Sequence, residues 1–199
     1  MDISLLLQHI NKKIKLSEKD ISFITEQLDV ETFKKGDFLL EQGNLCKHSS
    51  YVLKGCLKMY HTDKGGDEHV VSFAIEDWWA GDLASFISGS PADYSVKCLE
   101  NSTVVHFSHE TYELLYAKVP LFEKFFRELI SNAYVHSQKR IIHNFSLTAK
   151  ERYVKFRKKY PQFEQRVPQY LIASYLGVTK EFLSKIRKEI TFEKKSLQN

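Results

Sequence analysis

Short apolar runs separated by turn residues occupy the first half of the chain. From Phe33 to Phe107 these runs follow one another at roughly ten-residue intervals, and turns such as Asp63-Lys64-Gly65-Gly66 divide them. Several short strands with glycine-bearing turns are typical of a β-sandwich or β-roll. Because no strand–helix–strand alternation is present, the pattern disfavours a parallel dinucleotide-binding sheet. A helix with Ser17 as its N-cap is predicted ahead of the strands.

A helical period replaces the strands after residue 107. We expect a short helix from His109 to Val119 and a long helix from Pro120 to about Phe145. The long helix carries a stripe at alternating spacings of three and four residues, as coiled coils do. The members of this stripe are Phe122, Phe126, Leu129, Ala133 and His136. The stripe either packs on its own domain or meets a symmetric partner helix, and we favour the partner.

The stretch from Val167 to Ile190 has the most specific local pattern. Pro168 fits the start of one helix, and Gly177 fits the left-handed residue just beyond its end. Thr179 is a good N-cap for a second helix. The inward-facing positions are small or apolar, namely Ile172, Ala173, Leu176, Val178, Leu183 and Ile186. This pattern predicts a helix-turn-helix unit, in which the second helix enters the DNA major groove.

The second helix leaves a polar outer surface that can read DNA. Lysines can donate to guanine or phosphate, Glu181 can accept from a cytosine amino group, and Ser184 can pair with several base edges. We expect DNA contacts from Gln169, Tyr170, Thr179, Lys180, Glu181, Ser184, Lys185 and Lys188. The alternative is an ordinary amphipathic helix pair with a charged, solvated face.

Charge is distributed unevenly along the chain, with the excess of positive charge in its last third. The formal net charge of the whole chain is +4. Residues 1–139 hold 15 Lys and Arg against 20 Asp and Glu, whereas residues 140–199 hold 14 against 5, so the balance runs from −5 to +9. Structured basic segments often face nucleic acid, because each neutralised phosphate releases a counterion. A solvated basic surface is the plain alternative.

Composition excludes several classes of protein. With 43% hydrophobic and 27% charged residues, the 199-residue chain can bury a core, and no apolar run approaches the ~20 residues of a membrane helix. The first residues lack a secretory signal. The cysteines are odd in number and widely spaced (Cys46, Cys56 and Cys98), which suits a reducing cytoplasm and neither a disulfide framework nor a metal or iron–sulfur set. No catalytic motif is visible, so we expect neither an enzyme nor a metal site.

Taken in order, these residues resemble the Crp/Fnr family, which includes the cyclic AMP receptor protein and the fumarate–nitrate reduction regulator. The resemblance is carried by Gly36-Asp37, Gln42-Gly43, Tyr51-Val52-Leu53-Lys54-Gly55 and Gly81-Asp82, followed by the long helix and the terminal helix pair. It implies an α+β fold with a cyclic-nucleotide-binding-like β-roll (jelly roll) at residues 1–119, a dimerisation helix at 120–146 and a helix-turn-helix DNA-binding domain at 147–199. The short stretch after Ile190 leaves room for little or no wing.

The resemblance also implies a function. It predicts a cytoplasmic homodimeric transcription regulator that binds double-stranded DNA and contacts RNA polymerase, with no membrane association. The alternative is a sensor or scaffold whose roll binds a ligand or protein and whose C-terminal helices no longer recognise DNA.

The predicted ligand pocket departs from the family. Nucleotide-binding members have Gly-Glu in the roll, followed by Arg-Ser or Arg-Thr. Here the segment reads Gly81-Asp82-Leu83, and Tyr94 stands before Ser95 in the place of the arginine. A cyclic phosphate needs a compensating cation or many N–H donors, whereas tyrosine offers one neutral donor. We therefore expect these five residues to serve another small-molecule effector or the structure alone, with cyclic AMP bound poorly or not at all.

Overall fold

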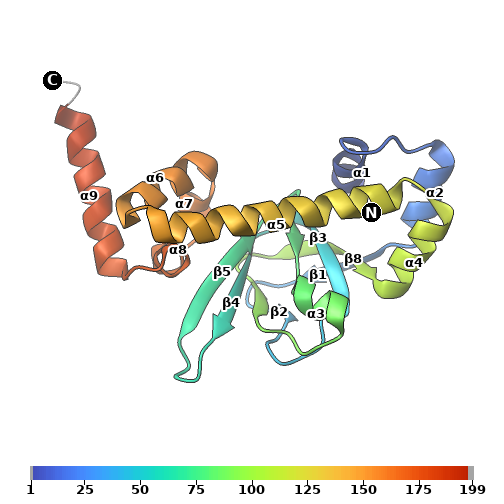
Figure 1. The fold of residues 1–199 in the computed structure, drawn as a ribbon, viewed down its shortest axis with the longest axis horizontal. Coiled ribbons are helices and arrows are strands. Elements are labelled where there is room, and N and C mark those ends of the chain that lie inside the picture. The colour runs from blue at the N-terminus through green and yellow to red at the C-terminus, as the bar shows by residue number, and fades with distance from the viewer. Residues whose placement is uncertain (1, 197–199) are drawn as a thin grey trace.

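The computed structural model describes residues 2–196 as a β-roll crossed by one long helix and followed by a group of shorter helices (Figure 1). Two helices precede the roll, α1 (Ser4–Asn11) and α2 (Glu18–Glu26). Ser17 caps α2 as predicted, because its hydroxyl oxygen accepts a hydrogen bond from the Asp20 backbone while the Asp20 carboxylate accepts one from the Ser17 backbone. The α+β fold expected from the sequence is confirmed.

Two antiparallel four-stranded sheets form the roll. The first has the order β1 (Asp29–Phe33), β8 (Ser102–Ser108), β3 (His48–Lys54) and β6 (Trp79–Ala80). The second has the order β2 (Phe38–Leu40), β7 (Ser95–Cys98), β4 (Leu57–Thr62) and β5 (Glu68–Ala74). The core between the sheets includes Val52, Leu57, Val96, Val104 and Phe107, all of them fully buried. Strand β5 is the edge of its sheet, which leaves its outer backbone groups available to another element.

Three helices complete the roll and lead out of it. They are α3 (Leu83–Ser88), α4 (His109–Lys118) and α5 (Phe122–Ser146). Helix α5 runs along the whole molecule, with α1, α2 and α4 near one end and the C-terminal helices at the other (Figure 1). Its first two turns join the roll core, because Phe122 and Phe125 are buried and Phe126 lies with its ring centroid 4.4 Å from that of Tyr112.

The first part of the stripe predicted to face a partner helix packs on the chain itself. Phe122 is fully buried among Phe107, Tyr112 and Phe125, so the expectation that it contacts a partner is wrong. Phe126 and Leu129 are half-buried against the roll, whereas Ala133 and His136 are exposed. Farther along the same side, the Arg140 guanidinium lies over the Tyr175 ring at 4.6 Å.

A second apolar stripe lies on the other side of α5, exposed to solvent. Tyr134, Ile141 and Phe145 follow one another at spacings of seven and four residues, flanked by Val135 and Ile142. At about 100° per residue, this stripe is more than a third of a turn from the stripe of Phe122. Phe145 is 88% exposed, which is unusual for a large aromatic side chain. We call these five residues the exposed stripe.

The C-terminal helices are α6 (Ala149–Lys159), α7 (Phe163–Arg166), α8 (Gln169–Leu176) and α9 (Lys180–Ser196). Thr148 and Glu151 form a capping box at the start of α6, because each accepts a hydrogen bond from the backbone of the other. Helix α9 continues to Ser196, so the described part of the chain contains no strand hairpin after the second helix of the pair.

The C-terminal helices and the roll share one hydrophobic cluster. Phe73 of β5 lies with its ring centroid 5.3 Å from Phe163 and 5.6 Å from Tyr175. Helix α8 covers the edge of β5, where the Val70 N–H donates to the Ser174 hydroxyl at 2.9 Å and that hydroxyl donates to the Glu68 carbonyl at 3.1 Å. The helix pair therefore has a fixed orientation on its own roll.

A cluster of charges adds to this attachment. The Arg166 guanidinium donates two hydrogen bonds to Glu76, at 2.7 and 3.0 Å, and two to Glu100, at 3.1 and 2.7 Å. Two carboxylates raise the pKa of Arg166, and the Arg166 side chain helps to hold the pKa of Glu76 below its usual range against the effect of burial. Arginine suits this position because its planar fork can bond two carboxylates at once.

Candidate functional site

Helices α8 and α9 form the predicted helix-turn-helix arrangement. Gly177 ends α8 with φ at +66°, a left-handed conformation that glycine adopts without strain. The Thr179 hydroxyl accepts a hydrogen bond from the Phe182 N–H at 3.2 Å, which is the expected N-cap of α9. The expected inner positions are buried, with Val178 half-buried: Ile172, Ala173, Leu176, Val178, Leu183 and Ile186.

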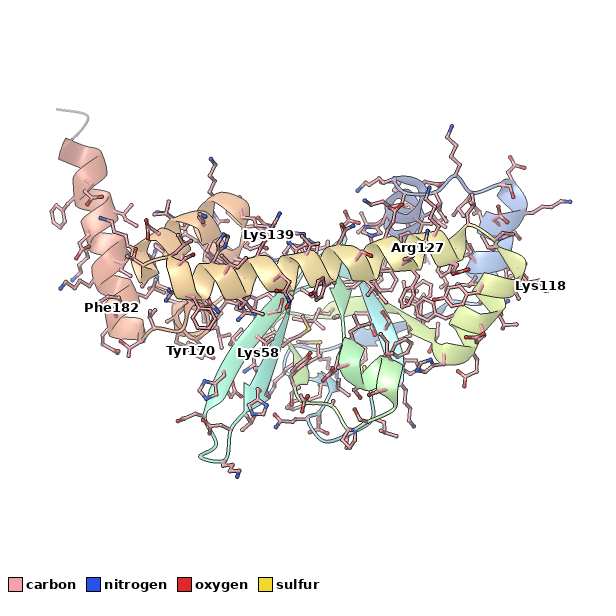
Figure 2. All side chains as sticks on the ribbon, viewed as in Figure 1. Lys58, Lys118, Arg127, Lys139, Tyr170 and Phe182 are labelled. Atoms are coloured by element: carbon pink, nitrogen blue, oxygen red, sulfur yellow. The ribbon has the colours of Figure 1, made fainter. Side chains whose placement is uncertain are left out.

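The outer surface of this helix pair is open. All eight residues expected to contact DNA are exposed, namely Gln169, Tyr170, Thr179, Lys180, Glu181, Ser184, Lys185 and Lys188. They lie at the end of the molecule remote from α4, where Figure 2 labels Tyr170 on α8 and Phe182 near the start of α9. Phe182 is 48% exposed, and it is not among the residues that we predicted to contact DNA.

Three further residues position the helix pair, and local sequence patterns do not reveal them. Arg152 of α6 donates to the carbonyl of Leu147 at 2.7 Å and to that of Leu176 at 3.0 Å, which satisfies the last turn of α8. Arg166 and Ser174 attach the pair to the roll through the contacts described above. Apart from the bond between Arg152 and Leu147, these contacts join segments far apart in the chain, so no spacing rule could have identified them.

A cavity of about 170 Å³ lies between the first half of α5 and the roll. Its lining is mainly apolar, and the residues are His48, Ser49, Trp79, Ala80, Gly81, Asp82, Leu83, Phe86, Phe126, Leu129, Ile130 and Ala133. Gly81 has φ at +136°, and a Cβ there would lie 3.2 Å from the His48 carbonyl oxygen, so only glycine fits without strain. The Trp79 indole N–H is buried and has no hydrogen-bond partner within residues 2–196.

The five residues expected to form one ligand pocket separate into two groups. Gly81, Asp82 and Leu83 line the cavity, whereas Tyr94 and Ser95 do not. The Asp82 carboxylate already accepts hydrogen bonds from the Ser85 N–H at 3.1 Å and the Asp93 N–H at 2.8 Å. It is buried and caps α3, so its oxygens hold the loop rather than point to open space.

The segment that corresponds to the family's phosphate-binding residues also makes hydrogen bonds within the chain. The Ser95 hydroxyl accepts a hydrogen bond from the Gln42 N–H at 3.0 Å. Burial, and then the neighbouring Asp82, raise the pKa of Tyr94 to about 12, so its hydroxyl stays neutral. None of the cavity's lining residues, all of which lie in the described chain, is a lysine or an arginine. The geometry is therefore poorly suited to a cyclic phosphate, which needs a cation or several free donors.

Two features of residues 2–196 bear on other functions. Between residues 2 and 196 no three or more His, Cys, Asp or Glu side chains come together as ligands for a metal ion. No helix in that range combines the length and apolar character that crossing a bilayer requires. His106 is buried with Nδ1 2.8 Å from the Ser50 hydroxyl and Nε2 3.2 Å from Glu31.

Comparison with known proteins matches both halves of the chain. Residues 30–118 match the family model "Cyclic nucleotide-binding domain". The chain is 25% identical over 185 residues to the fumarate and nitrate reduction regulatory protein of Vibrio cholerae serotype O1, and the match covers 86% of this chain and 72% of the relative. A match of that coverage takes in α5, most of the roll and at least part of the C-terminal helices.

Solved structures share the architecture. The c-di-GMP-responsive global regulator CLP of Xanthomonas campestris superposes with a TM-score of 0.71 at 12% identity, over 89% of this chain and 93% of that one. FixK2 of Bradyrhizobium japonicum gives a TM-score of 0.70 at 14% identity, over 83% of this chain and 85% of that one. At such identities the likeness shows the fold alone. Together with the family model and the Vibrio relative, it makes this chain similar in sequence and in fold to the Crp/Fnr transcription regulators.

Proposed function

We propose that this chain regulates transcription by binding a specific sequence of double-stranded DNA as a homodimer. The observation that carries the proposal is the outer face of α9, which presents Lys180, Glu181, Ser184 and Lys185 to solvent while Leu183 is buried beneath them. A lysine-bearing helix held by its apolar side is what major-groove reading requires. The exposed carboxylate of Glu181 favours base contacts, because near phosphate alone it would be repelled.

The exposed stripe of α5 supports the dimer. Tyr134, Ile141 and Phe145 repeat at coiled-coil spacing on a face that residues 2–196 leave exposed. Packing this face on the same face of a second copy would bury it symmetrically, as two-fold dimers do. Two recognition helices would then meet half-sites about 34 Å apart on one side of the duplex. The proposal also includes contact with RNA polymerase, because the resemblance to the Crp/Fnr family implies it.

The cavity beside Gly81 is the place for a small-molecule effector in this proposal. Its volume and apolar lining suit a neutral molecule of about one aromatic ring, since an apolar cavity of about 150 Å³ accepts benzene. The unpartnered Trp79 N–H would suit one hydrogen-bond acceptor on that molecule. Calorimetric titration with cyclic AMP and cyclic GMP should give no micromolar binding; such binding by either would contradict this assignment.

DNA binding is tested by its dependence on salt and on two lysines. We expect the purified full chain to enrich one duplex sequence from a random library, and its affinity to fall steeply with salt. Lys180→Ala and Lys185→Ala should each weaken binding about tenfold or more if they read bases, or reduce the salt slope by about one if they bind phosphate. Lys118→Ala is the matched control, because this exposed lysine lies on α4 at the far end of the molecule (Figure 2).

The alternative sensor or scaffold makes the opposite prediction. If no duplex is bound at low salt, or if all three lysine variants bind as the original chain does, the outer face of α9 does not read DNA. A regulatory activity that survives removal of residues 147–199 would then favour the sensor or scaffold.

A further inference from the structure

Phe182 lies beside the polar residues at the start of α9. Its backbone is fixed by the N-cap, because its N–H donates to the Thr179 hydroxyl. At about 100° per residue, Lys180 and Phe182 lie on opposite flanks of Glu181. The buried side of the helix is on the far side of the axis, where Leu183 and Ile186 are almost fully covered. Phe182 therefore lies at the border of the surface proposed to enter the groove.

The exposure of Phe182 is not explained by packing within the chain. Nearly half of its side chain is open to solvent, at 48%, although leaving a phenylalanine in water costs part of its burial free energy. The residues beside it on the outer face, Glu181 and Lys185, are charged and exposed. A lone aromatic side chain in such a surface has few apolar partners until another molecule binds.

The major groove offers an aromatic side chain one apolar group. Among the groups that the four base pairs present there, the 5-methyl group of thymine is the one alkyl group, beside the hydrogen-bond donors and acceptors. Phenylalanine has no hydrogen-bonding atoms in its side chain, so it cannot read the other positions. Its lysine and glutamate neighbours can read guanine and cytosine edges, so an apolar contact would add a distinct type of information.

We propose that Phe182 contacts the 5-methyl group of a thymine and makes the protein select a T·A pair at one position of each half-site. This inference rests on the proposed DNA-binding function and adds a specificity-determining residue to it. The contact is apolar, so it contributes little to the salt dependence of binding, in contrast to the lysines.

The test removes the methyl group from the DNA and the ring from the protein. The best duplex is selected with the full chain, and each thymine is replaced in turn by uracil in both half-sites, which deletes only the 5-methyl group. Burial of one such group changes affinity about fourfold, so two symmetric replacements at the contacted position should weaken binding about fifteenfold. The affinity of Phe182→Ala should be unchanged by the same replacement of thymine by uracil. Phe182→Leu should show part of the loss of affinity that the original chain shows.

Leu114→Ala is the control, since Leu114 is similarly exposed on α4, far from α9, and should keep the full response to uracil. Thermal melting checks that the variants fold. If Phe182→Ala weakens binding but responds to uracil as the original chain does, Phe182 packs on the sugar–phosphate backbone or elsewhere, and the inference is wrong while the proposed function stands. If no duplex sequence is enriched at all, the proposed function itself fails, and the inference with it.

Discussion

The two stripes of α5 differ in what covers them. One stripe, which begins at Phe122, enters the roll core and continues past the cavity to Arg140, whose guanidinium lies on Tyr175 of α8. The other, which contains Tyr134, Ile141 and Phe145, is exposed along the second half of the helix. Both repeat at spacings of three, four or seven residues, so periodicity identifies a helix with apolar faces and does not say which face meets a second molecule.

The difference lies in residues outside the helix. The first stripe is covered because Phe107, Tyr112 and Tyr175 bring aromatic rings to it from β8, α4 and α8. No such ring is contributed to Phe145 by the described chain, which is why it is so exposed. We therefore expect the first stripe to contribute to fold stability and the second to association, and substitutions in each should separate the two effects.

The largest effect should follow the loss of the Phe122 ring. Phe122→Ala leaves a cavity among Phe107, Tyr112 and Phe125, and buried Phe→Ala changes cost about 3–5 kcal/mol of unfolding free energy. Because the ring is packed within one chain, the loss should be the same at every protein concentration. Denaturant unfolding at several concentrations measures this. The neighbouring Leu121→Ala, on the exposed side, should change the unfolding free energy by about 0.5 kcal/mol or less. Equal losses in both variants would contradict the assignment.

Local signals in the sequence were enough for much of the fold. Ser17, Gly177 and Thr179 each act on the backbone within a few residues, and their roles as caps and helix ends are confirmed. The buried positions of the helix pair follow from the helical period in the same way. Contacts such as the Ser174 hydroxyl on Val70 join residues 104 positions apart, and a single sequence holds no local trace of them.

The second prediction concerns the exposed stripe. In a two-fold dimer, Ile141→Glu would bring two carboxylates to an apolar interface, and we expect dimer formation to weaken by about 2 kcal/mol or more, roughly thirtyfold. Sedimentation equilibrium measures the dissociation constant. In contrast to Phe122→Ala, the effect on unfolding should disappear on dilution, because the substitution leaves the monomer core unchanged. Lys139→Ala, an exposed residue of the same helix outside the stripe (Figure 2), should associate as the original chain does.

A monomer at all concentrations, with or without Ile141→Glu, would contradict the role given to the exposed stripe. A dimer that is weakened by Ala133→Glu and not by Ile141→Glu would show instead that the partner meets the stripe predicted first from the sequence.

The candidate site was predictable where residue chemistry alone decides it. The lysines and Ser184 could be assigned to an outer face because the buried positions fix the rotation of α9. The ligand pocket was harder to predict. The side-chain oxygens of Asp82 and Ser95 accept hydrogen bonds from the backbone N–H groups of Ser85, Asp93 and Gln42. The hydrogen-bond partner of a buried polar group depends on loop geometry, and the identity of the residue does not reveal that partner.

The smallest effect concerns His136, which the sequence placed against a partner helix. In the structure its Nδ1 lies 3.4 Å from the Lys159 ammonium of α6, and partial burial, then Lys159 and Lys139, lower its pKa below the ordinary 6.5. The unfolded chain then binds the proton more readily, so His136 lowers stability as the pH falls through 6.5 toward the folded-state pKa. Because His136 is exposed, solvent screening limits this to about a few tenths of a kcal/mol. NMR titration of the imidazole should show the lowered pKa, and Lys159→Ala should raise it while Lys158→Ala should not. A pKa that responds to protein concentration and not to Lys159→Ala would mean that His136 meets the partner helix after all.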